Sequence, residues 1–477
     1  MTQVFISYSR KNLDFVERLA SDLQAEGLDV WYDLSHLEGG MQWAPEIQSA
    51  IQQSQYFIFV LSPDSVNSTW VQREYLYAEK LKLNIIPLML QECDIPLWSM
   101  HLQYIDIQGK KYDLQFAELR KVLNIEQRIA TKNKLDCVIL CGGYSQRLWP
   151  LTIDISKVLL PVAGKPALEH VVNFVQESPD IHKIILSVNQ KFASQIDNFV
   201  NDYESQGQPR HPIEVIVEPS TQQKEKLGPV GALQYIVSQS EPRDLLVIGG
   251  DNIFGSRLDD FLSFIHKTGE FLSCITVYDH RDSTQDKSKY GLVDRDDAGR
   301  VRRLIEKPQK ATLNYISAAC YFFKKRDVEA IQDYILAGED PDSLGDFVSW
   351  LIRQSRIMSF MLPSFWFDVG TPEVLLKANR HFLAHSISRD ATLSETECVE
   401  PVRIDANSEV SNSKLGPNVY IGPGVQVIDS TIRDSIIMEQ CEIRACDIKN
   451  SLIGPGCVIE NLPMDGWIFG PKSKVSK

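Results

Sequence analysis

The chain has 477 residues, so at roughly 150 residues per domain its length predicts about three domains, and 43% hydrophobic residues can supply each with a core. The 49 Lys and Arg residues are outnumbered by 63 Asp and Glu, and the net charge of −14 disfavours adsorption to nucleic acid or anionic membranes. The sequence contains no stretch of about 18 apolar residues and no basic N-terminal leader. We therefore expect a cytoplasmic protein with neither a nucleic-acid nor a membrane partner.

Residues 1–124 alternate short apolar runs with amphipathic stretches. The apolar runs lie at 4–8, 28–32, 56–61, 85–90 and 104–107, and helical spacing occurs between them, as at Phe15, Leu19 and Leu23. This alternation predicts a parallel sheet covered by helices. The polar stretch 125–134 has no sustained apolar period, so we expect a linker there.

Residues 135–388 form a second α/β pattern. A strand at Cys137–Leu140 leads into Gly142 and Gly143, and further strands are expected at 184–188, 214–217, 245–248 and 272–277. A segment of about 250 residues with this pattern predicts a single doubly wound, Rossmann-like domain.

Residues 389–477 lose the helical spacing. Aliphatic residues recur every six positions instead, as at Leu415, Ile421 and Val427, and Gly-Pro turns lie between them. The period predicts a hexapeptide-repeat β-helix, expected to be left-handed, whose aliphatic side chains stack inward. The run between Ser430 and Cys446 is irregular in this respect.

Several motifs in the first segment suggest a family. They are FISYS at 5–9, VWYD at 30–33, LEGG at 37–40, LSP at 61–63 and STWVQRE at 68–74. In this order they resemble the bacterial Toll/interleukin-1 receptor (TIR) domain. The resemblance implies a flavodoxin-like fold with five parallel strands.

The TIR family contains self-associating adaptors and enzymes that cleave the nicotinamide glycosidic bond of NAD⁺. Glu74 matches the catalytic glutamate of the enzymes, and a carboxylate suits this chemistry because the departing nicotinamide leaves an oxocarbenium-like sugar. The resemblance makes Phe5, Ser7 and Asp33 candidate NAD⁺ contacts. The alternative is that Glu74 is an ordinary solvated residue near a helix N-terminus.

Three further expectations concern the neighbourhood of Glu74. Thr69 is expected to be the N-cap of the helix that carries it, with Gln72 at the third helical position. Trp70 is expected to pack rather than to contact a ligand. Trp43 could cover the site or face a neighbouring TIR domain.

The second segment opens with LCGGYSQRLWPLT at 140–152 and SKVLLPVAGKP at 156–166. These strings resemble the signature of sugar-1-phosphate nucleotidyltransferases. In that family the glycine-rich turn, here Gly142 and Gly143, brings backbone N–H groups to a triphosphate. Arg147 and Lys157 match the two cationic residues that offset its charge while pyrophosphate leaves.

Four downstream motifs fit the same family, namely GGDNIF at 249–254, YGLV at 290–293, EKP at 306–308 and WFDVGTP at 366–372. The resemblance implies that Asp251 and Asp368 bind Mg²⁺, whose preference is for hard oxygen ligands. Lys307 would meet the sugar phosphate and Gly231 would leave room for the base. The string at 251–254 is most similar to thymidylyltransferases that act on glucose 1-phosphate.

Two positions depart from the family pattern. Ser145-Gln146 stands where the family usually has Gly-Thr, and Ala319 replaces a common glycine. Added Cβ atoms near phosphate or sugar could narrow the site, so the domain could bind nucleotide yet turn over poorly.

Three functions from different classes are open. The first is an NAD⁺ hydrolase, working in bacterial antiphage immunity, whose nucleotidyltransferase domain senses a nucleotide or sugar phosphate. The second is an enzyme that makes a nucleoside-diphosphate sugar from a nucleoside triphosphate and a sugar 1-phosphate, with the TIR domain as an interaction module. The third is a scaffold without activity. Left-handed β-helices and TIR enzymes both imply, by analogy, a homo-oligomer.

Overall fold

The structure is a computed structural model. It describes residues 4–26, 28–33, 44–100, 102–108, 112–123, 134–220, 226–239, 242–267, 272–281 and 286–477. The chain divides into two compact units, Met1–Asn133 and Lys134–Lys477. Trp43, the LEGG loop at 37–40 and positions 125–133 of the expected linker lie outside the described residues.

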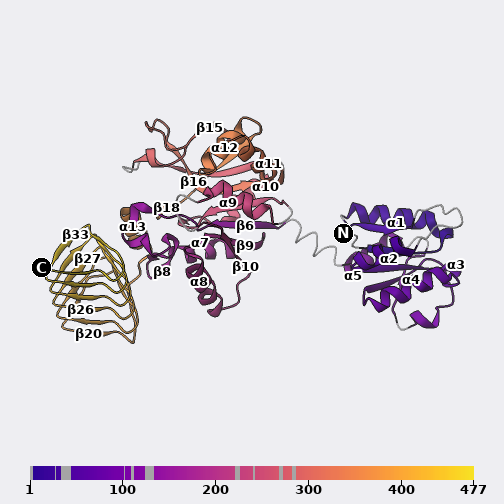
Figure 1. The fold of residues 1–477 in the computed structure, drawn as a ribbon, viewed down its shortest axis with the longest axis horizontal. Helices are drawn as coiled ribbons and strands as arrows, with labels where there is room; N and C mark the ends of the chain where they lie inside the picture. The colour runs from indigo at the N-terminus through magenta and orange to yellow at the C-terminus, as the bar shows by residue number, and fades with distance from the viewer. Residues whose placement is uncertain are drawn as a thin grey trace. The chain divides into compact units, whose positions relative to one another are not determined.

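The first unit is a five-stranded parallel sheet, drawn in indigo and violet in Figure 1. The strands are β1 (Val4–Ser7), β2 (Val30–Tyr32), β3 (Tyr56–Leu61), β4 (Asn84–Met89) and β5 (Ile105–Asp106). The helices are α1 (Leu13–Ala25), α2 (Ala44–Gln53), α3 (Pro63–Val66), α4 (Thr69–Lys80) and α5 (Tyr112–Val122). All five strands expected from the apolar runs are present.

Alternation along the strands divides the core of this unit between the two faces of the sheet. Val4 and Ile6 of β1 pack with α1 and α5, whereas Phe5 packs with α2 and α4. The strand order is β2-β1-β3-β4-β5, which is the flavodoxin-like order. In such sheets ligands bind where the connections diverge, so the carboxyl ends of β1 and β3 mark the expected site.

The second unit begins with a nine-stranded sheet in the order β10-β9-β6-β11-β16-β13-β17, with β14 and β15 attached to β16. These strands are β6 (Leu135–Leu140), β9 (Ile181–Asn189), β10 (Ile213–Glu218), β11 (Leu245–Gly249), β13 (Ser273–Asp279), β14 (Leu292–Arg295), β15 (Val301–Ile305), β16 (Tyr315–Phe323) and β17 (Ile357–Met361). Two short pairs accompany the sheet, β7 (Pro161–Val162) with β8 (Lys165–Pro166) and β12 (Asn252–Phe254) with β18 (Trp366–Asp368).

Helices cover both faces of this sheet (Figure 1). One face packs against α7 (Ala167–Gln176), α8 (Ala193–Ser205) and α10 (Leu258–Lys267). The other packs against α9 (Gly228–Val237), α11 (Lys325–Leu336) and α12 (Leu344–Ile352). Helix α13 (Pro372–Phe382) leads out of the domain.

Residues 386–476 form a β-helix of three parallel sheets. The first sheet contains β19 (Ser386–Ile387), β22 (Val402–Ile404), β25 (Val419–Ile421), β28 (Ile436–Ile437), β31 (Leu452–Ile453) and β34 (Ile468–Phe469). The second contains β20 (Thr392–Ser394), β23 (Glu409–Ser411), β26 (Gln426–Ile428), β29 (Glu442–Arg444), β32 (Val458–Glu460) and β35 (Lys474–Ser476). The third contains β21 (Glu397–Cys398), β24 (Lys414–Leu415), β27 (Thr431–Arg433), β30 (Asp447–Lys449) and β33 (Pro463–Asp465).

The repeat is not a uniform six residues, which corrects one detail of the sequence analysis. Six residues separate the stacked Ile404 from Val410, but five separate Val410 from Leu415. Each of these two steps holds one residue at positive φ, Asn407 in the longer step and Asn412 in the shorter one. Because this residue comes one position earlier in the shorter step, the side closes one residue sooner. The run 430–446 looked irregular for this reason and is a regular coil.

The β-helix and the nucleotidyltransferase-like domain share a hydrophobic cluster. Tyr420 and Met438 of the β-helix are buried against Leu148 and Leu151, which follow the glycine-rich loop. Arg403 Nη1 donates to the Ala163 carbonyl oxygen at 2.9 Å. The β-helix therefore supports the segment directly after Arg147.

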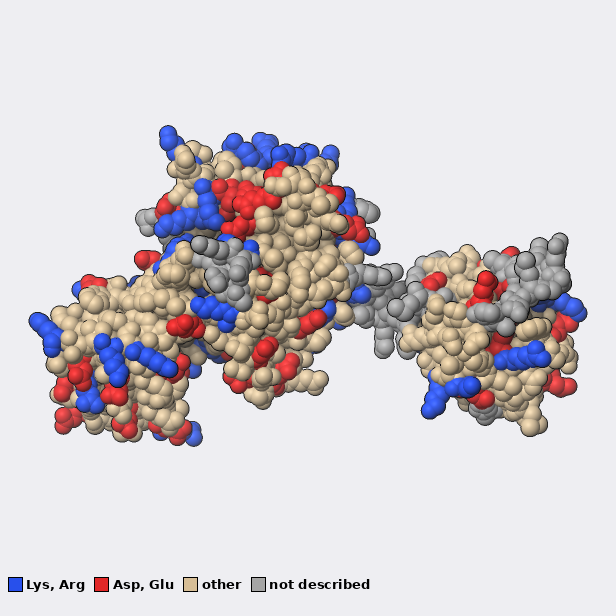
Figure 2. All heavy atoms as spheres, in the orientation of Figure 1, with Lys and Arg blue, Asp and Glu red and all other residues tan. Residues whose placement is uncertain are grey.

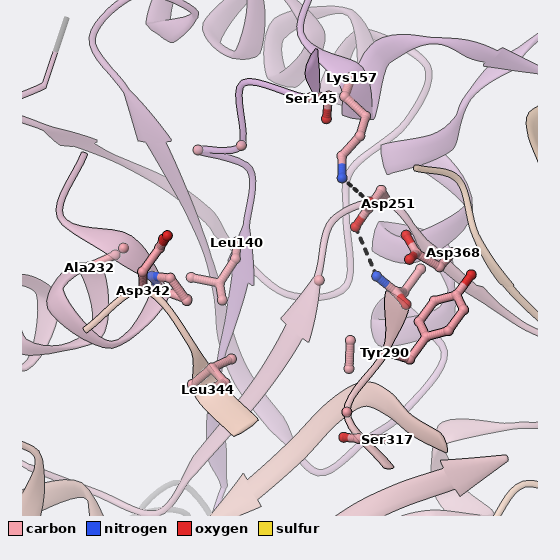
Figure 3. A pocket seen from close by; sticks show the side chains of 18 of the residues that line it. Leu140, Ser145, Lys157, Ala232, Asp251, Tyr290, Ser317, Asp342, Leu344 and Asp368 are labelled. Atoms are coloured by element: carbon pink, nitrogen blue, oxygen red, sulfur yellow. Dashed lines mark hydrogen bonds and ion pairs between the residues drawn. The ribbon is translucent and has the colours of Figure 1, made fainter. Parts of the chain in front are cut away.

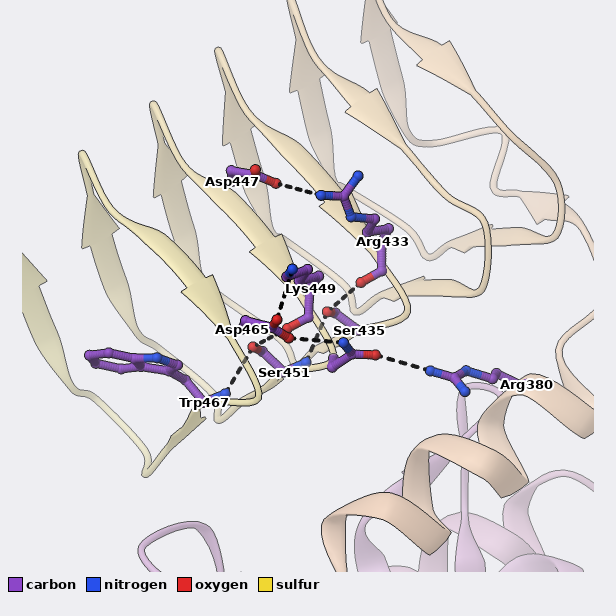
Figure 4. A network of polar contacts seen from close by, with 9 residues as sticks. Arg380, Arg433, Ser435, Asp447, Lys449, Ser451, Asp465 and Trp467 are labelled. Atoms are coloured by element: carbon purple, nitrogen blue, oxygen red, sulfur yellow. Dashed lines mark hydrogen bonds and ion pairs between the residues drawn. The ribbon is translucent and has the colours of Figure 1, made fainter.

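Polar contacts complete this junction (Figure 4). Arg380 of α13 donates to the Asn450 side chain at 3.2 Å and contacts Asp434 at 2.9 Å. Serines of successive coils continue the network, because Ser435 Oγ accepts from the Ser451 N–H at 3.1 Å. In the described part of the chain, no helix combines the length and the apolar character needed to cross a membrane.

Candidate functional sites

Glu74 lies in the second turn of α4, and a cap fixes where that helix begins. The side chain of Ser68 accepts a hydrogen bond from the Val71 N–H at 3.4 Å. The N-cap is therefore Ser68, not Thr69, and Val71 takes the third helical position that was expected of Gln72. Ser and Thr are both favoured N-cap residues, and here the extended backbone of Ser68 (φ −82°, ψ 116°) shows that Ser68 is the cap.

Three polar residues meet at the carboxyl ends of β1 and β2. Ser7, the last residue of β1, donates from Oγ to Glu74 Oε2 at 2.6 Å. Asp33 directly follows β2 and contacts Arg10 at 3.4 Å. Burial raises the pKa of Glu74 from 4.5 to about 7, opposed by the Ser7 hydrogen bond and aided by the Asp33 charge. Glu74 is therefore expected to change its charge near neutral pH.

Two aromatic residues of this segment lie in unexpected places. Phe5 is 1% exposed and stacks on both Trp31 and Phe57, at ring distances of 4.9 and 5.5 Å. Trp70 is 49% exposed and Arg73 lies over its ring at 5.3 Å, so its contacts are at the surface. That Trp70 packs rather than contacts a ligand stays a prediction. Trp98 packs against Tyr75, at 4.6 Å.

The second unit contains a cavity of about 460 Å³. Its wall is formed by the loop after β6, the start of α9, the end of β11 and the loops around Tyr290 and Asp368 (Figure 3). Among the residues expected at a functional site, those that line the cavity are Gly142, Gly143, Arg147, Lys157, Asp251, Lys307 and Asp368. The fold thus brings together residues more than two hundred positions apart.

Asp251 and Asp368 form the polar centre of this cavity. They come from adjacent strands, since Asn252 of β12 pairs with Asp368 of β18. The Lys157 ammonium contacts Asp251, and the Asn252 side chain donates to the other Asp251 oxygen at 2.8 Å (Figure 3). Burial and the Asp251 charge raise the pKa of Asp368 to about 7. Burial opposes ionisation of Asp251, but the Lys157 ammonium brings its pKa below the usual value.

The remaining cations lie at the rim of the cavity. Arg147 is exposed, and its guanidinium group lies close to Gly370. A Cβ added at Gly370 would come within 3.0 Å of Arg147 Nη2. Lys307 is 66% exposed along its side chain and contacts Glu306 at 3.5 Å. At Gly143 the structure leaves open space for a ligand, since a Cβ would meet no atom within 4 Å.

Gly231 does not line the cavity. A Cβ there would face Leu227 at 3.1 Å and Pro341 at 3.8 Å. Its neighbours Gly228, Pro229 and Ala232 line the cavity instead. These three residues of α9, and not Gly231, border the space that a ligand would occupy.

The sequence analysis missed two carboxyl groups of the cavity wall, buried Glu218 and partly buried Glu306. Glu218 ends β10 and accepts from Ser187 Oγ at 2.7 Å, and burial raises its pKa. Glu306 follows β15, and burial likewise raises its pKa. Both lie where a strand ends, and for Glu218 the rule that ligands bind beyond the carboxyl ends of parallel strands could have found it.

Both departures from the family pattern fall on left-handed backbone. Ser145 has φ 39° and Ala319 has φ 50°, and both line the cavity. Ala319 lies in a bulge of β16, where the pairing with β13 shifts between Ile275 and Val277. Glycine adopts such backbone without a steric penalty, whereas other residues do not.

Ala319→Gly is therefore expected to keep or raise stability, by up to about 1 kcal/mol, because relief of the left-handed penalty offsets the greater freedom of glycine in the unfolded chain. Ala232→Gly is the matched control, since Ala232 lines the same cavity from within α9. That variant should lose about 1 kcal/mol. Urea unfolding of both variants checks this, and an equal loss in both would contradict it.

Comparison with known proteins agrees with this arrangement. Residues 136–385 match the sequence model of the family described as nucleotidyl transferase, and residues 4–122 match that of the TIR domain. "Bifunctional protein GlmU" of Methanocaldococcus jannaschii is 28% identical over 346 residues, which cover 68% of this chain and 78% of that protein. "Probable mannose-1-phosphate guanyltransferase" of Schizosaccharomyces pombe is 28% identical over 353 residues, covering 68% and 83%. The chain thus belongs to the nucleotidyl transferase family and carries a TIR domain before its nucleotidyltransferase domain.

Proposed function

We propose that the TIR domain hydrolyses NAD⁺ to release nicotinamide, and that the nucleotidyltransferase domain regulates this activity by binding nucleotide and sugar phosphate. The observation that carries the first part is the contact of Ser7 with the buried carboxyl group of Glu74 at the diverging ends of β1 and β3. A carboxylate in such low-dielectric surroundings interacts strongly with a positive charge.

The proposed chemistry uses this carboxylate electrostatically. As the nicotinamide bond breaks, the ribose gains oxocarbenium character, and ionised Glu74 offsets that charge. Ser7 holds the carboxylate in place through its hydrogen bond. Asp33 lies close enough to raise the pKa of Glu74, which makes it a candidate to bind the ribose hydroxyl groups. Phe5, buried between two rings, would shape the wall of the site rather than contact NAD⁺.

The nucleotidyltransferase cavity has the donor set for a divalent cation. Asp251 is buried and Asp368 is partly buried, each carboxylate disfavours ionisation of the other, and a bound cation would offset that repulsion. Among the described residues no group of three or more His, Cys, Asp and Glu side chains could hold a metal, so phosphate oxygens and water would complete the shell. Bound Mg²⁺ would neutralise charge that develops on the phosphates.

The other residues of the cavity would act on the substrates directly. Gly142 and Gly143 bring backbone to the triphosphate, and Arg147 and Lys157 offset its charge as the sugar phosphate displaces pyrophosphate. Lys307, beside Glu306 at the far rim, would hold the phosphate of the sugar 1-phosphate. Among the nucleotides, dTTP and UTP are the first to test.

The combination of domains supports a role in bacterial antiphage defence, in which depletion of NAD⁺ stops the infected cell. Self-association through the TIR domain and the β-helix would bring TIR domains together. The second candidate function is synthesis of a nucleoside-diphosphate sugar, with the TIR domain as an interaction module. The complete set of Arg147, Lys157, Asp251 and Asp368 in one cavity favours it.

One experiment separates these functions. The full chain is incubated with NAD⁺ and Mg²⁺, with and without dTTP and glucose 1-phosphate, and nicotinamide and pyrophosphate are measured separately. We expect nicotinamide release whose rate changes when the cavity is filled. Pyrophosphate without any nicotinamide would reject the first function in favour of the second. If the rate of nicotinamide release is unchanged by saturating nucleotide and sugar phosphate, the proposed regulation of the TIR domain is rejected.

A further inference from the structure

A second, unassigned groove of the nucleotidyltransferase domain is lined by four arginines. They are Arg300, Arg326, Arg353 and Arg356, and all four are exposed. The groove is open and encloses about 420 Å³, close to the volume of the catalytic cavity. Figure 2 shows basic side chains gathered on the part of the domain that carries α12 and β15. A groove of this size can hold a small molecule.

The groove lies beyond the amino ends of the sheet strands, whereas the catalytic cavity lies beyond their carboxyl ends. Leu272, which precedes β13, and Arg356, which precedes β17, both line it. These two strands are parallel and start level with each other, since Ser273 pairs with Ile357. The catalytic residues instead follow the carboxyl ends of β6 and β11. The arginine groove is therefore separate from the catalytic cavity.

The charges in the groove are only partly balanced. Arg326 contacts Asp327 at 3.5 Å and Arg353 contacts Glu339 at 3.6 Å. Within the described ranges, no ion pair joins Arg300 or Arg356 to a carboxylate. Four cations with two carboxylate partners leave an excess positive charge.

Helix α11 begins beside the groove, and Arg326 lies in its first turn. The neighbouring cations Lys324 and Lys325 are paired with Asp244 and Glu329, and Asp327 is an acidic residue of the same turn. The excess positive charge therefore comes from the arginines of the groove, and a bound anion would relieve the repulsion among them.

Two elements connect the groove directly with the catalytic cavity. Leu344, at the start of α12, lines the cavity, whereas Ile352, at its end, lines the groove. Strand β15 begins after Arg300 of the groove and ends before Glu306 of the cavity. The two elements are joined by a hydrogen bond from Ser349 Oγ to the Leu304 carbonyl oxygen at 2.7 Å.

We propose that this arginine groove binds a small molecule with more than one phosphate group, such as a nucleoside polyphosphate or a sugar bisphosphate. Guanidinium groups bind phosphate oxygens in pairs, and four of them match a ligand with more than one phosphate group. Occupancy would restrain α12 and β15 and so the Glu306–Lys307 end of the catalytic cavity. This last consequence rests on the proposed role of Lys307.

The test uses the full chain and inorganic tripolyphosphate in a buffer without Mg²⁺. An Arg147→Gln and Lys307→Gln background weakens anion binding in the catalytic cavity, and both side chains are exposed, so folding should be kept. In that background, Arg326→Gln, Arg353→Gln and Arg356→Gln together should weaken tripolyphosphate binding at least tenfold in calorimetry. Tripolyphosphate should also slow hydrogen exchange in α12 and β15.

The matched control removes three arginines elsewhere, Arg257, Arg433 and Arg444, whose side chains are 70%, 43% and 48% exposed and are paired with carboxylates. It changes the net charge equally and should alter the affinity less than twofold. Equal affinity loss in both triple variants, or none in either, would overturn the site. Parallel titrations with a nucleoside triphosphate and a sugar bisphosphate identify the source, because tighter binding than tripolyphosphate requires contacts to the base or sugar. Single Arg353→Gln and Arg356→Gln variants serve if the triple variant does not fold.

Discussion

Glu74→Gln is expected to lower nicotinamide release from NAD⁺ by at least about 10²-fold, which is the usual cost of removing one preorganised electrostatic stabiliser. The amide can still accept the hydrogen bond from Ser7, so the geometry at the end of β1 should persist. The negative charge alone is lost. Nicotinamide measured by chromatography, at saturating NAD⁺, tests this expectation.

The matched control is Glu79→Gln, which makes the same chemical change on the same helix. Its side chain accepts from Tyr75 at 3.4 Å and lies five residues beyond Glu74. This variant should release nicotinamide at the wild-type rate. Near-wild-type activity of Glu74→Gln would mean that another residue carries the reaction.

The pKa of Glu74 gives a second readout for the same variant. Because the pKa is about 7, the ionised fraction rises roughly tenfold from pH 6 to pH 8, and activity should rise with it. A carboxyl group with a raised pKa in the folded state stabilises the fold below its unfolded pKa, and that contribution is lost as the pH rises through about 7. The Gln variant has no such loss, so its Tm advantage over wild type should be greater at pH 8 than at pH 5. Equal Tm differences between the variant and wild type at both pH values would contradict a raised pKa of Glu74 in the folded protein.

Asp368→Asn is expected to lower Mg²⁺-dependent pyrophosphate release by about 10²-fold or more without lowering the Tm. A neutral amide is a poor ligand for a hard cation, so turnover falls. The same change removes the repulsion between partly buried Asp368 and buried Asp251, so folding should not be destabilised. Pyrophosphate release from each nucleoside triphosphate with sugar 1-phosphate, together with calorimetric unfolding, measures both effects.

Asp251→Asn makes a sharp contrast with Asp368→Asn. It should also abolish metal-dependent turnover, but it takes away the carboxylate that contacts Lys157, whose side chain is only 16% exposed. Removing one partner of a buried ion pair is strongly destabilising, so the Tm should fall. Asp259→Asn, in an exposed pair with Arg257, is the neutral control. A lower Tm for Asp368→Asn than for Asp251→Asn would show that the charges are arranged otherwise.

Local patterns in the sequence determined the strands, the fold classes and most of the cavity. The apolar runs of β1, β3 and β6 could be read directly, because a buried parallel strand must be apolar throughout. The motifs around Arg147, Lys157, Asp251 and Asp368 could be found because each is contiguous in the chain. The coiled repeat of the β-helix was visible because interior aliphatic residues must recur once on each side.

Other features could be determined only from the tertiary structure, because the sequence offers two similar residues for one role and packing selects between them. Ser68 and Thr69 can both cap a helix, and Trp70 and Trp98 have the same side chain, so only the helix and its neighbours show which residue caps and which ring packs against Tyr75. Gly231 turned away from the cavity because a helix exposes only one face. The arginine groove could not be predicted from the sequence, since Arg300 precedes β15, Arg326 lies in α11 and Arg353 follows α12, and only folding brings their charges together.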